Sequence, residues 1–251
     1  MNHPVRPPVL LAVAHGSRDP RHAATVHALL RAVRSLRPGL RAEVAFLDFN
    51  APSVPRVLER LAADGVREVV ALPLLLTRAF HAKADIPAVL RSAPPSLRIR
   101  QAEVLGPSPL LLEAVHRRLY EAGLDPADKG STGLVLASAG STDPEAIAVI
   151  ADTARELRHT GWCAVRPAFA SASLPRTEDA VRELRAEGCA RVAVAPYVLA
   201  PGRLPDRIAE GARGADVLAG VLGAAPELAR LLLERHDGAV AGAGRVLRDT
   251  A

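Results

Sequence analysis

The chain repeats part of itself, and the two copies differ in their histidines. Residues 9–20 (VLLAVAHGSRDP) return as residues 133–144 (GLVLASAGSTDP). His15 of the first copy is replaced by Ala139 in the second, and His81 has a leucine opposite it. A duplicated scaffold needs the same core twice, whereas a reaction needs only one set of reactive side chains. The asymmetry therefore predicts chemistry in the first half.

Each copy alternates apolar strand patterns with amphipathic helix patterns, which predicts an α/β fold with internal duplication. We expect two similar domains, residues 1–125 and 130–251, each a four-stranded parallel sheet flanked by helices, joined by a linker at 123–132. The expected strands are residues 9–14, 42–47, 68–75, 97–104, 134–138, 162–169, 191–198 and 215–222. The expected helices are residues 19–36, 53–63, a short one starting near 86, 107–121, 144–158, 177–187, 205–212 and 226–236.

Composition narrows the classes of partner. The net charge is +5, and the basic residues are almost all arginine, with Lys83 and Lys129 as the only lysines. Two interpretations stay open: a coding bias toward arginine, or affinity for an acidic ligand such as a polycarboxylate or phosphate. Nucleic acid is the less favoured candidate ligand, because no basic run is interleaved with aromatic residues.

Cysteine usage and hydropathy favour a cytoplasmic protein. Two cysteines, Cys163 and Cys189, make no disulfide framework. The apolar run at residues 9–14 is too short for a signal peptide or a membrane span. We expect no membrane partner, and either a monomer or a homodimer, since the internal duplication can replace a dimer.

Polar residues follow three of the predicted strands in the first half. His15 comes directly after the first strand, Asp48 after the second, and the loop at residues 76–81 after the third. Ligands bind beyond the carboxyl ends of strands in such sheets, so we expect these residues to share one edge. Imidazole nitrogens suit Fe, Co, Ni and Zn, and two such ligands with vacant positions suit a site that releases its metal.

Each of these residues also has an ordinary structural interpretation. His15 could hydrogen-bond only its own loop, His81 could be an exposed loop histidine, and Asp48 could be a strand-end cap. As a functional group, Asp48 could bind the metal, orient a histidine or accept protons. Four further residues are candidates for holding a ligand carboxylate: Ser17, Arg18, Arg78 and Lys83. The alternative for the three basic residues is that they are ordinary surface charges.

Three ordered motifs resemble those of the sirohydrochlorin chelatases, a group of class II tetrapyrrole chelatases. They are AHGSRDP at residues 14–20, FLD at 46–48 followed by Pro52-Ser53, and PLLL at 73–76 leading to His81 and then DIP at 85–87. The resemblance covers residues 8–120 strongly. The second half is similar to the degenerate repeat of the long, two-domain members.

The resemblance implies a lyase that inserts Co²⁺ or Fe²⁺ into sirohydrochlorin, in cobalamin or sirohaem biosynthesis, without ATP or an organic cofactor. It implies two chelatase-like (flavodoxin-like) domains, the second lining the other wall of a cleft. The family's metal and catalytic residues map onto His15, His81 and Asp48, and the partners would be the divalent metal and the polycarboxylate tetrapyrrole. Asp48 is one methylene shorter than the Glu usual in the family, and Arg78-Ala-Phe80 stands where many members carry Gly before the second histidine.

Three other functions stay open from the sequence. The chain could act on another tetrapyrrole, carry a tetrapyrrole or metal without catalysis, or be an anion-binding regulatory module in which His15 and His81 are replaceable. Substrate profiling separates the first from a sirohydrochlorin chelatase, and a rate measurement separates the second.

Overall fold

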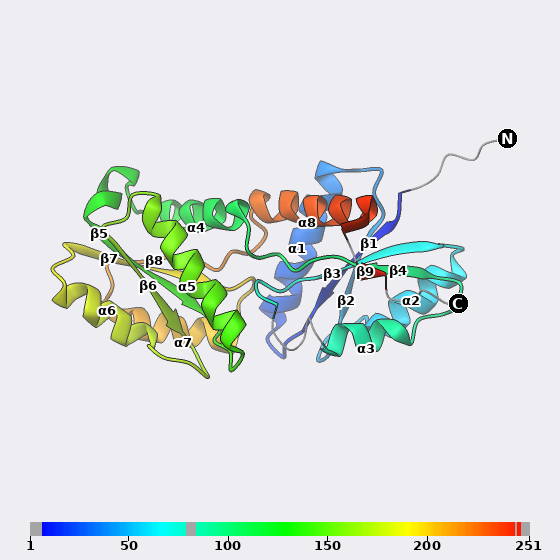
Figure 1. The fold of residues 1–251 in the computed structure, drawn as a ribbon, viewed down its shortest axis with the longest axis horizontal. Coiled ribbons are helices and arrows are strands. Elements are labelled where there is room, and N and C mark those ends of the chain that lie inside the picture. Colours follow the sequence, from blue (N-terminus) through cyan, green and yellow to red (C-terminus); the bar gives the residue numbers. More distant parts are fainter. Residues whose placement is uncertain (1–6, 79–83, 244, 247–251) are drawn as a thin grey trace. The chain divides into compact units, whose positions relative to one another are not determined.

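The computed structural model describes residues 7–78, 84–243 and 245–246, and the chain folds into two compact units (Figure 1). Unit 1 comprises Met1–Leu105 and Ala229–Ala251, and unit 2 comprises Gly106–Leu228. No helix in these ranges is long and apolar enough to cross a membrane.

Unit 1 is built on a parallel sheet with the order β2-β1-β3-β4, to which a short antiparallel β9 adds a fifth strand beside β4. α2 and α3 cover one face of the sheet, and α1 and α8 cover the other (Figure 1). The strands are β1 (Val9–Ala14), β2 (Ala42–Phe46), β3 (Glu68–Pro73), β4 (Arg98–Gln101) and β9 (Arg245–Val246). The helical elements are α1 (Pro20–Leu36), α2 (Val54–Ala63), α3 (Ile86–Arg91), α8 (Pro226–Gly238) and the π-helical η4 (Ala239–Ala243).

Unit 2 repeats this plan with the parallel order β6-β5-β7-β8. Its strands are β5 (Thr132–Ser138), β6 (Ala164–Phe169), β7 (Arg191–Tyr197) and β8 (Val217–Leu218). Its helices are α4 (Pro109–Glu121), α5 (Pro144–His159), α6 (Thr177–Ala186), α7 (Arg203–Gly211) and the 3-10 helices η2 (Pro126–Ser131) and η3 (Ala212–Gly214). The predicted α/β class with two four-stranded parallel sheets is confirmed, and β9 is an addition that the repeat did not indicate.

The same residue choices start the first helix of each unit. Asp19 precedes Pro20, and its carboxylate accepts a hydrogen bond from a backbone N–H of the first turn of α1. Asp143 and Pro144 do the same for α5. An Asp cap satisfies a donor that the helix leaves unpaired, and proline has no N–H to satisfy. Each capped helix follows a six- or seven-residue strand, β1 or β5, that is buried along its whole length.

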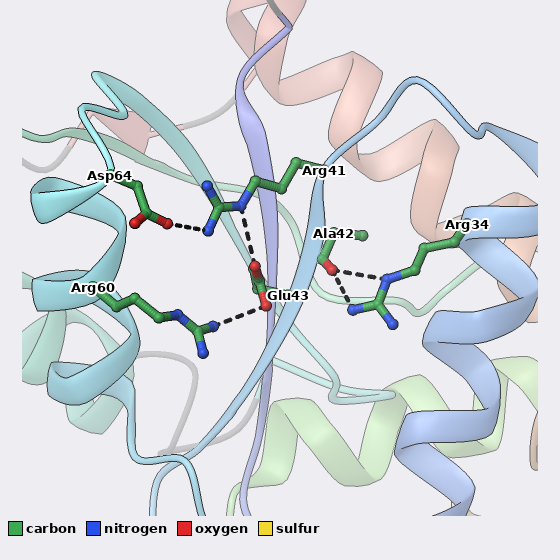
Figure 2. A network of polar contacts seen from close by, with 6 residues as sticks. All are labelled: Arg34, Arg41, Ala42, Glu43, Arg60 and Asp64. Atoms are coloured by element: carbon green, nitrogen blue, oxygen red, sulfur yellow. Dashed lines mark hydrogen bonds and ion pairs between the residues drawn. The ribbon is translucent and has the colours of Figure 1, made fainter.

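Side chains on both neighbouring helices hold β2, the edge strand of unit 1 (Figure 2). The Arg34 guanidinium of α1 donates two hydrogen bonds to the carbonyl oxygen of Ala42. On the other side, Glu43 accepts from Arg41 and from Arg60 of α2, and Arg41 also pairs with Asp64. Charged side chains along an edge strand discourage pairing with another chain, so this network protects the sheet edge as well as fixing the helices.

The compact units do not follow the boundaries of the sequence repeat. The repeat predicts a division at residues 125–130, but α4 of the first copy belongs to unit 2, and most of α8 of the second copy belongs to unit 1. Arg235 of α8 donates to the carbonyl oxygens of Val104 and Leu105, and His236 lies 2.9 Å from the carbonyl oxygen of Pro8. The last helix of each copy thus packs with the sheet of the other copy: α4 contacts β7 in unit 2, and α8 lies along the sheet of unit 1 (Figure 1). The predicted linker contains η2, and β5 already begins at Thr132.

Candidate active site

His15 and Asp48 lie side by side where β1 and β2 end. The two strands stay hydrogen-bonded past their last residues: Leu47 N–H donates to the Ala14 carbonyl and Asp48 N–H to the His15 carbonyl, each at 2.9 Å. His15 is half-buried and Asp48 is exposed. The prediction that these two residues share the carboxyl edge of the sheet is therefore correct at the level of the backbone.

The loop after β1 depends on a glycine. Gly16 has a φ of +97°, and a Cβ there would lie 1.9 Å from the Asp48 carbonyl oxygen. One further bond ties this loop to the one after β2, because Ser17 N–H donates to Asn50 Oδ1 at 2.7 Å. Within the loop after β2, Asn50 N–H donates to the Asp48 carbonyl. The two loops form one hydrogen-bonded structure that fixes the backbone of both candidate residues.

Phe49 adds an exposed aromatic ring beside His15. Its ring centroid is 6.2 Å from that of His15, in a stacked arrangement, and the Arg18 guanidinium carbon lies 5.4 Å from the same ring. Phe49 is 51% exposed and has a positive φ of 60°, which is uncommon outside glycine. The sequence interpretation missed this residue, although an aromatic three residues past the end of β2, in a chain with seven aromatic residues among 251, is a usable signal.

His22, on the first turn of α1, is a second histidine near the site, and the sequence analysis did not single it out. It is half-buried, and within the described structure its Nδ1 has no hydrogen-bond partner. Burial lowers the pKa of His22 below its usual value, and a positive charge on His15 lowers it further. His22 is therefore a neutral imidazole at neutral pH.

The structure places the four candidate carboxylate-binding residues in different environments. The Ser17 hydroxyl oxygen accepts a hydrogen bond from Asp19 N–H, so it supports the loop. Arg18 lies over Phe49, and the exposed Arg78 forms an ion pair with Glu103. Lys83 lies outside the described residues.

His81 also lies outside the described residues, so its expected approach to His15 is untested. The chain leading to it does start at the same edge, because Leu74 N–H donates to the Val13 carbonyl just past β3. Among the residues the structure describes, no three His, Cys, Asp or Glu side chains gather as a metal-ligand set.

Unit 2 contains the same pair of loops without the reactive side chains. Gly140 has a φ of +93°, and a Cβ there would lie 1.8 Å from the Ser171 carbonyl oxygen. Ser171 N–H donates to the Ala139 carbonyl at 3.0 Å, as Asp48 does to His15. Ala172 repeats the positive φ of Phe49. The backbone is thus preserved, while histidine, aspartate and phenylalanine become alanine, serine and alanine.

A family model matches the chain twice. The CbiX model covers residues 9–122 and again residues 133–239. The chain belongs to the CbiX family. The two matches correspond to the two copies of the repeat, and the resemblance to sirohydrochlorin chelatases is confirmed.

Individual relatives of this CbiX-family chain are similar over most of its length. A protein of Priestia megaterium named sirohydrochlorin cobaltochelatase is 27% identical over 96% of this chain and 83% of its own. A protein of Bacillus subtilis (strain 168) named sirohydrochlorin ferrochelatase is 29% identical over 79% of this chain and 77% of its own. The solved structure of SirB from Bacillus subtilis with Fe³⁺ superimposes with a TM-score of 0.80 at 25% identity, covering 94% of this chain and 97% of that one.

Proposed function

We propose that this chain is a sirohydrochlorin chelatase, a lyase that inserts Co²⁺ or Fe²⁺ into sirohydrochlorin. The observation that carries the proposal is the loop pair built twice with His15 and Asp48 in one copy only. Membership of the CbiX family and the names of the similar proteins support the substrate class. The metal is a substrate of this reaction, and the reaction needs no ATP and no organic cofactor.

His15 is proposed as the residue that delivers the metal. Its Nδ1 lies 3.3 Å from the Gly16 carbonyl oxygen, and a carbonyl only accepts, so this contact requires the proton on Nδ1. The lone pair on Nε2 is then the one that binds a cation. His81 is proposed as the second imidazole. Two neutral imidazoles hold Co²⁺ or Fe²⁺ with positions left for water and for the pyrrole nitrogens.

Asp48 is proposed as the carboxylate of the site. Metal insertion displaces two pyrrole N–H protons, and a carboxylate close to the metal can accept them or balance the charge of the cation. Asp48 Oδ1 already accepts a hydrogen bond from Phe49 N–H at 2.8 Å, which orients the side chain. The other carboxylate oxygen is the one that can face the reacting atoms.

The tetrapyrrole is proposed to bind through its carboxylates and its flat face. Arg18 and Arg78 are exposed guanidinium groups near the His15 edge, and guanidinium–carboxylate pairs are strong, directional contacts. Lys83 and Ser17 are proposed as further carboxylate contacts. The Arg78–Glu103 ion pair is exposed, so breaking it in favour of a ligand carboxylate costs little. The exposed Phe49 ring is suited to stack on the macrocycle.

Two further parts of the proposal concern organisation and location. The residues for metal insertion all lie in the first copy of the repeat, and we assign the second copy to binding the tetrapyrrole from its other side, in a monomer or a homodimer. We propose the cytoplasm as the location, because a chain with only two cysteines has no disulfide framework.

The test is anaerobic metal insertion into sirohydrochlorin, followed by absorbance, with Co²⁺ and Fe²⁺ in parallel. His15→Ala is the central variant, and the exposed His159→Ala at the end of α5 is the matched control. We expect the protein to accelerate insertion, His15→Ala to lose at least about a hundredfold of that acceleration, and His159→Ala to keep it. The faster metal indicates the pathway, cobalt for cobalamin and iron for sirohaem.

Three results would each contradict a part of the proposal. Tight tetrapyrrole binding without acceleration by either metal would leave a non-catalytic carrier. Acceleration that survives in His15→Ala would keep the chelatase but remove the assigned role of His15. Faster insertion into another tetrapyrrole than into sirohydrochlorin would change the substrate.

A further inference from the structure

Two free cysteines meet at the amino edge of the unit 2 sheet. Cys163 directly precedes β6, and Cys189 lies two residues before β7. Their Sγ atoms are 3.4 Å apart, although the residues are 26 positions apart in the chain. This edge is opposite the carboxyl ends of the strands, where Ala139 and Ser171 stand. The cysteine pair therefore takes no part in the site proposed above.

The two thiols differ in access. Cys163 is exposed and Cys189 is half-buried against the apolar core of unit 2. Both line a pocket of about 360 Å³, together with Gly130, Ser131, Ala164, Glu187, Gly188 and Ala190. The Glu187 carboxylate in this pocket is paired with Arg166 at 2.6 Å. A small molecule thus has room to reach Cys163 beside its partner sulfur.

The fold itself does not call for thiols at these positions. In the first copy, Leu40 and Val66 occupy the corresponding places and supply apolar volume. Around Cys189, the backbone makes room for sulfur, because a Cβ on Gly133 of β5 would lie 2.9 Å from Cys189 Sγ. Packing accounts for an apolar residue at the half-buried position of Cys189, and leaves the exposed thiol of Cys163 beside it to be explained.

We propose that Cys163 and Cys189 form a reversible intramolecular disulfide by exchange with a low-molecular-weight disulfide. Cys163 is the entry thiol and Cys189 the resolving thiol. The pocket holds the small-molecule half of the mixed disulfide between the two steps.

The exchange balances in two steps. The Cys163 thiolate attacks the small disulfide, an S–S bond to Cys163 forms, and one small thiol leaves. The Cys189 thiolate then attacks Cys163 Sγ, the protein disulfide forms, and the second small thiol leaves. The two cysteines lose two electrons and two protons in total, and the small disulfide gains both. Burial raises the pKa of the Cys189 thiol, and its contact with Cys163 adds to the effect, which favours Cys163 as the first attacker.

The test uses the full-length reduced protein and glutathione disulfide as the probe, with mass spectrometry and maleimide counting of free thiols. We expect the wild type to lose both free thiols and two hydrogen masses, to give one cross-linked peptide containing both cysteines, and to regain both thiols with dithiothreitol. Cys189→Ser should stop at one glutathione on Cys163. Cys163→Ser should react at least about tenfold more slowly, because its remaining thiol is half-buried.

Cys189→Val, which uses the residue of the first copy, repeats the Cys189→Ser experiment in a background that keeps the packing. Retention of two free thiols by the wild type would overturn the proposal. So would accumulation of two glutathiones without a cross-link, or equal rates for the two single variants. Thiol counting and mass do not depend on metal insertion. A failure of this proposal can therefore be told apart from a failure of the proposed chelatase activity.

Discussion

At the scale of single residues, Gly16 decides the geometry of the candidate site. Replacing it with alanine forces a side chain into a backbone conformation with positive φ and into the Asp48 carbonyl. We expect Gly16→Ala to lower the free energy of unfolding by roughly 2–4 kcal/mol and to slow metal insertion strongly, because the two loops must separate. Denaturant unfolding and the insertion assay measure the two effects.

Two other glycine variants serve as controls, because they separate the effect of positive φ from the effect of a clash with a neighbouring loop. Gly65 has a positive φ, but a Cβ there would meet no other atom. Gly65→Ala should therefore lower the free energy of unfolding by only about 1 kcal/mol and leave the insertion rate unchanged. Gly140→Ala produces the same clash in unit 2, with Ser171, and should cost as much stability as Gly16→Ala with less effect on the rate constant. Equal slowing by Gly16→Ala and Gly140→Ala would refute the assignment of the site to the first copy.

The charge of Asp48 can be tested without disturbing the loop. Asp48→Asn keeps an oxygen that accepts from Phe49 N–H but removes the negative charge. We expect insertion to slow by about tenfold to a hundredfold while tetrapyrrole affinity changes little, since proton transfer and metal charge balance need the carboxylate. Equal losses in rate and in affinity, measured by insertion kinetics and binding titration, would instead indicate a substrate-binding role.

At the scale of elements, a half-buried histidine is expected to make the stability of unit 2 depend on pH. His116 of α4 accepts a hydrogen bond at Nε2 from Trp162 Nε1–H at 3.2 Å, just before β6. Burial, with a smaller contribution from the charge of Lys129, lowers the pKa of His116 to about 4. A protonated Nε2 could not accept from Trp162, so only the neutral imidazole fits the folded state.

The sign of the effect follows from the two pKa values. The unfolded chain has an ordinary histidine pKa near 6.5 and takes up a proton between pH 6.5 and 4, whereas the folded chain does not. The contribution to stability is therefore complete above about pH 6.5 and is lost as the pH falls toward 4. We expect about 1 kcal/mol less stability at pH 5 than at pH 7.5, after allowance for partial exposure. The stability of the His116→Gln variant should depend less on pH than that of the wild type, and the exposed His159→Gln variant should match the wild type. Urea unfolding across this pH range measures both, and an unchanged pH dependence in His116→Gln would contradict the assignment.

Sequence patterns predicted the elements best where local chemistry marks both ends. β1 and α1 were predicted almost to the residue, because a continuous apolar run is followed by His-Gly-Ser and then by an Asp-Pro helix start. β8 is shorter than predicted, at two residues, because its apolar pattern continues after the ladder with β7 has ended. Periodicity reports burial, whereas a strand also requires a hydrogen-bonded neighbour.

The candidate site was predictable in part for the same kind of reason. The strand order places the ends of β1 and β2 together, so His15 and Asp48 follow from topology. Phe49 and His22 contribute through side-chain packing and loop conformation, which no sequence period encodes. Phe49 in particular depends on a positive φ that sequence rules assign to glycine first.

At the scale of the whole molecule, the repeat of the sequence and the units of the fold divide the chain differently. Helix α4 is encoded in the first copy but stabilises unit 2, where Arg117 forms a bidentate pair with the buried Glu227. Arg118 of the same helix donates to the Leu222 carbonyl. Helix α8, encoded in the second copy, packs in unit 1 and pairs with it through Asp237 and Arg37. A repeat detected in sequence marks what was duplicated, and does not say which copy's helix covers which sheet.

This exchange predicts how fragments of the chain behave. A fragment cut at the unit boundary, residues 106–228, retains α4 and should unfold cooperatively on its own. A fragment cut at the repeat boundary, residues 130–251, lacks α4, leaves the Glu227 carboxylate without Arg117, and should be less stable by at least about 3 kcal/mol. Adding residues 1–125 to it should restore cooperative unfolding and give a complex that co-elutes in gel filtration, because each fragment supplies the helix that the other lacks. If residues 130–251 alone were as stable in urea as residues 106–228, α4 would not contribute to the stability of unit 2.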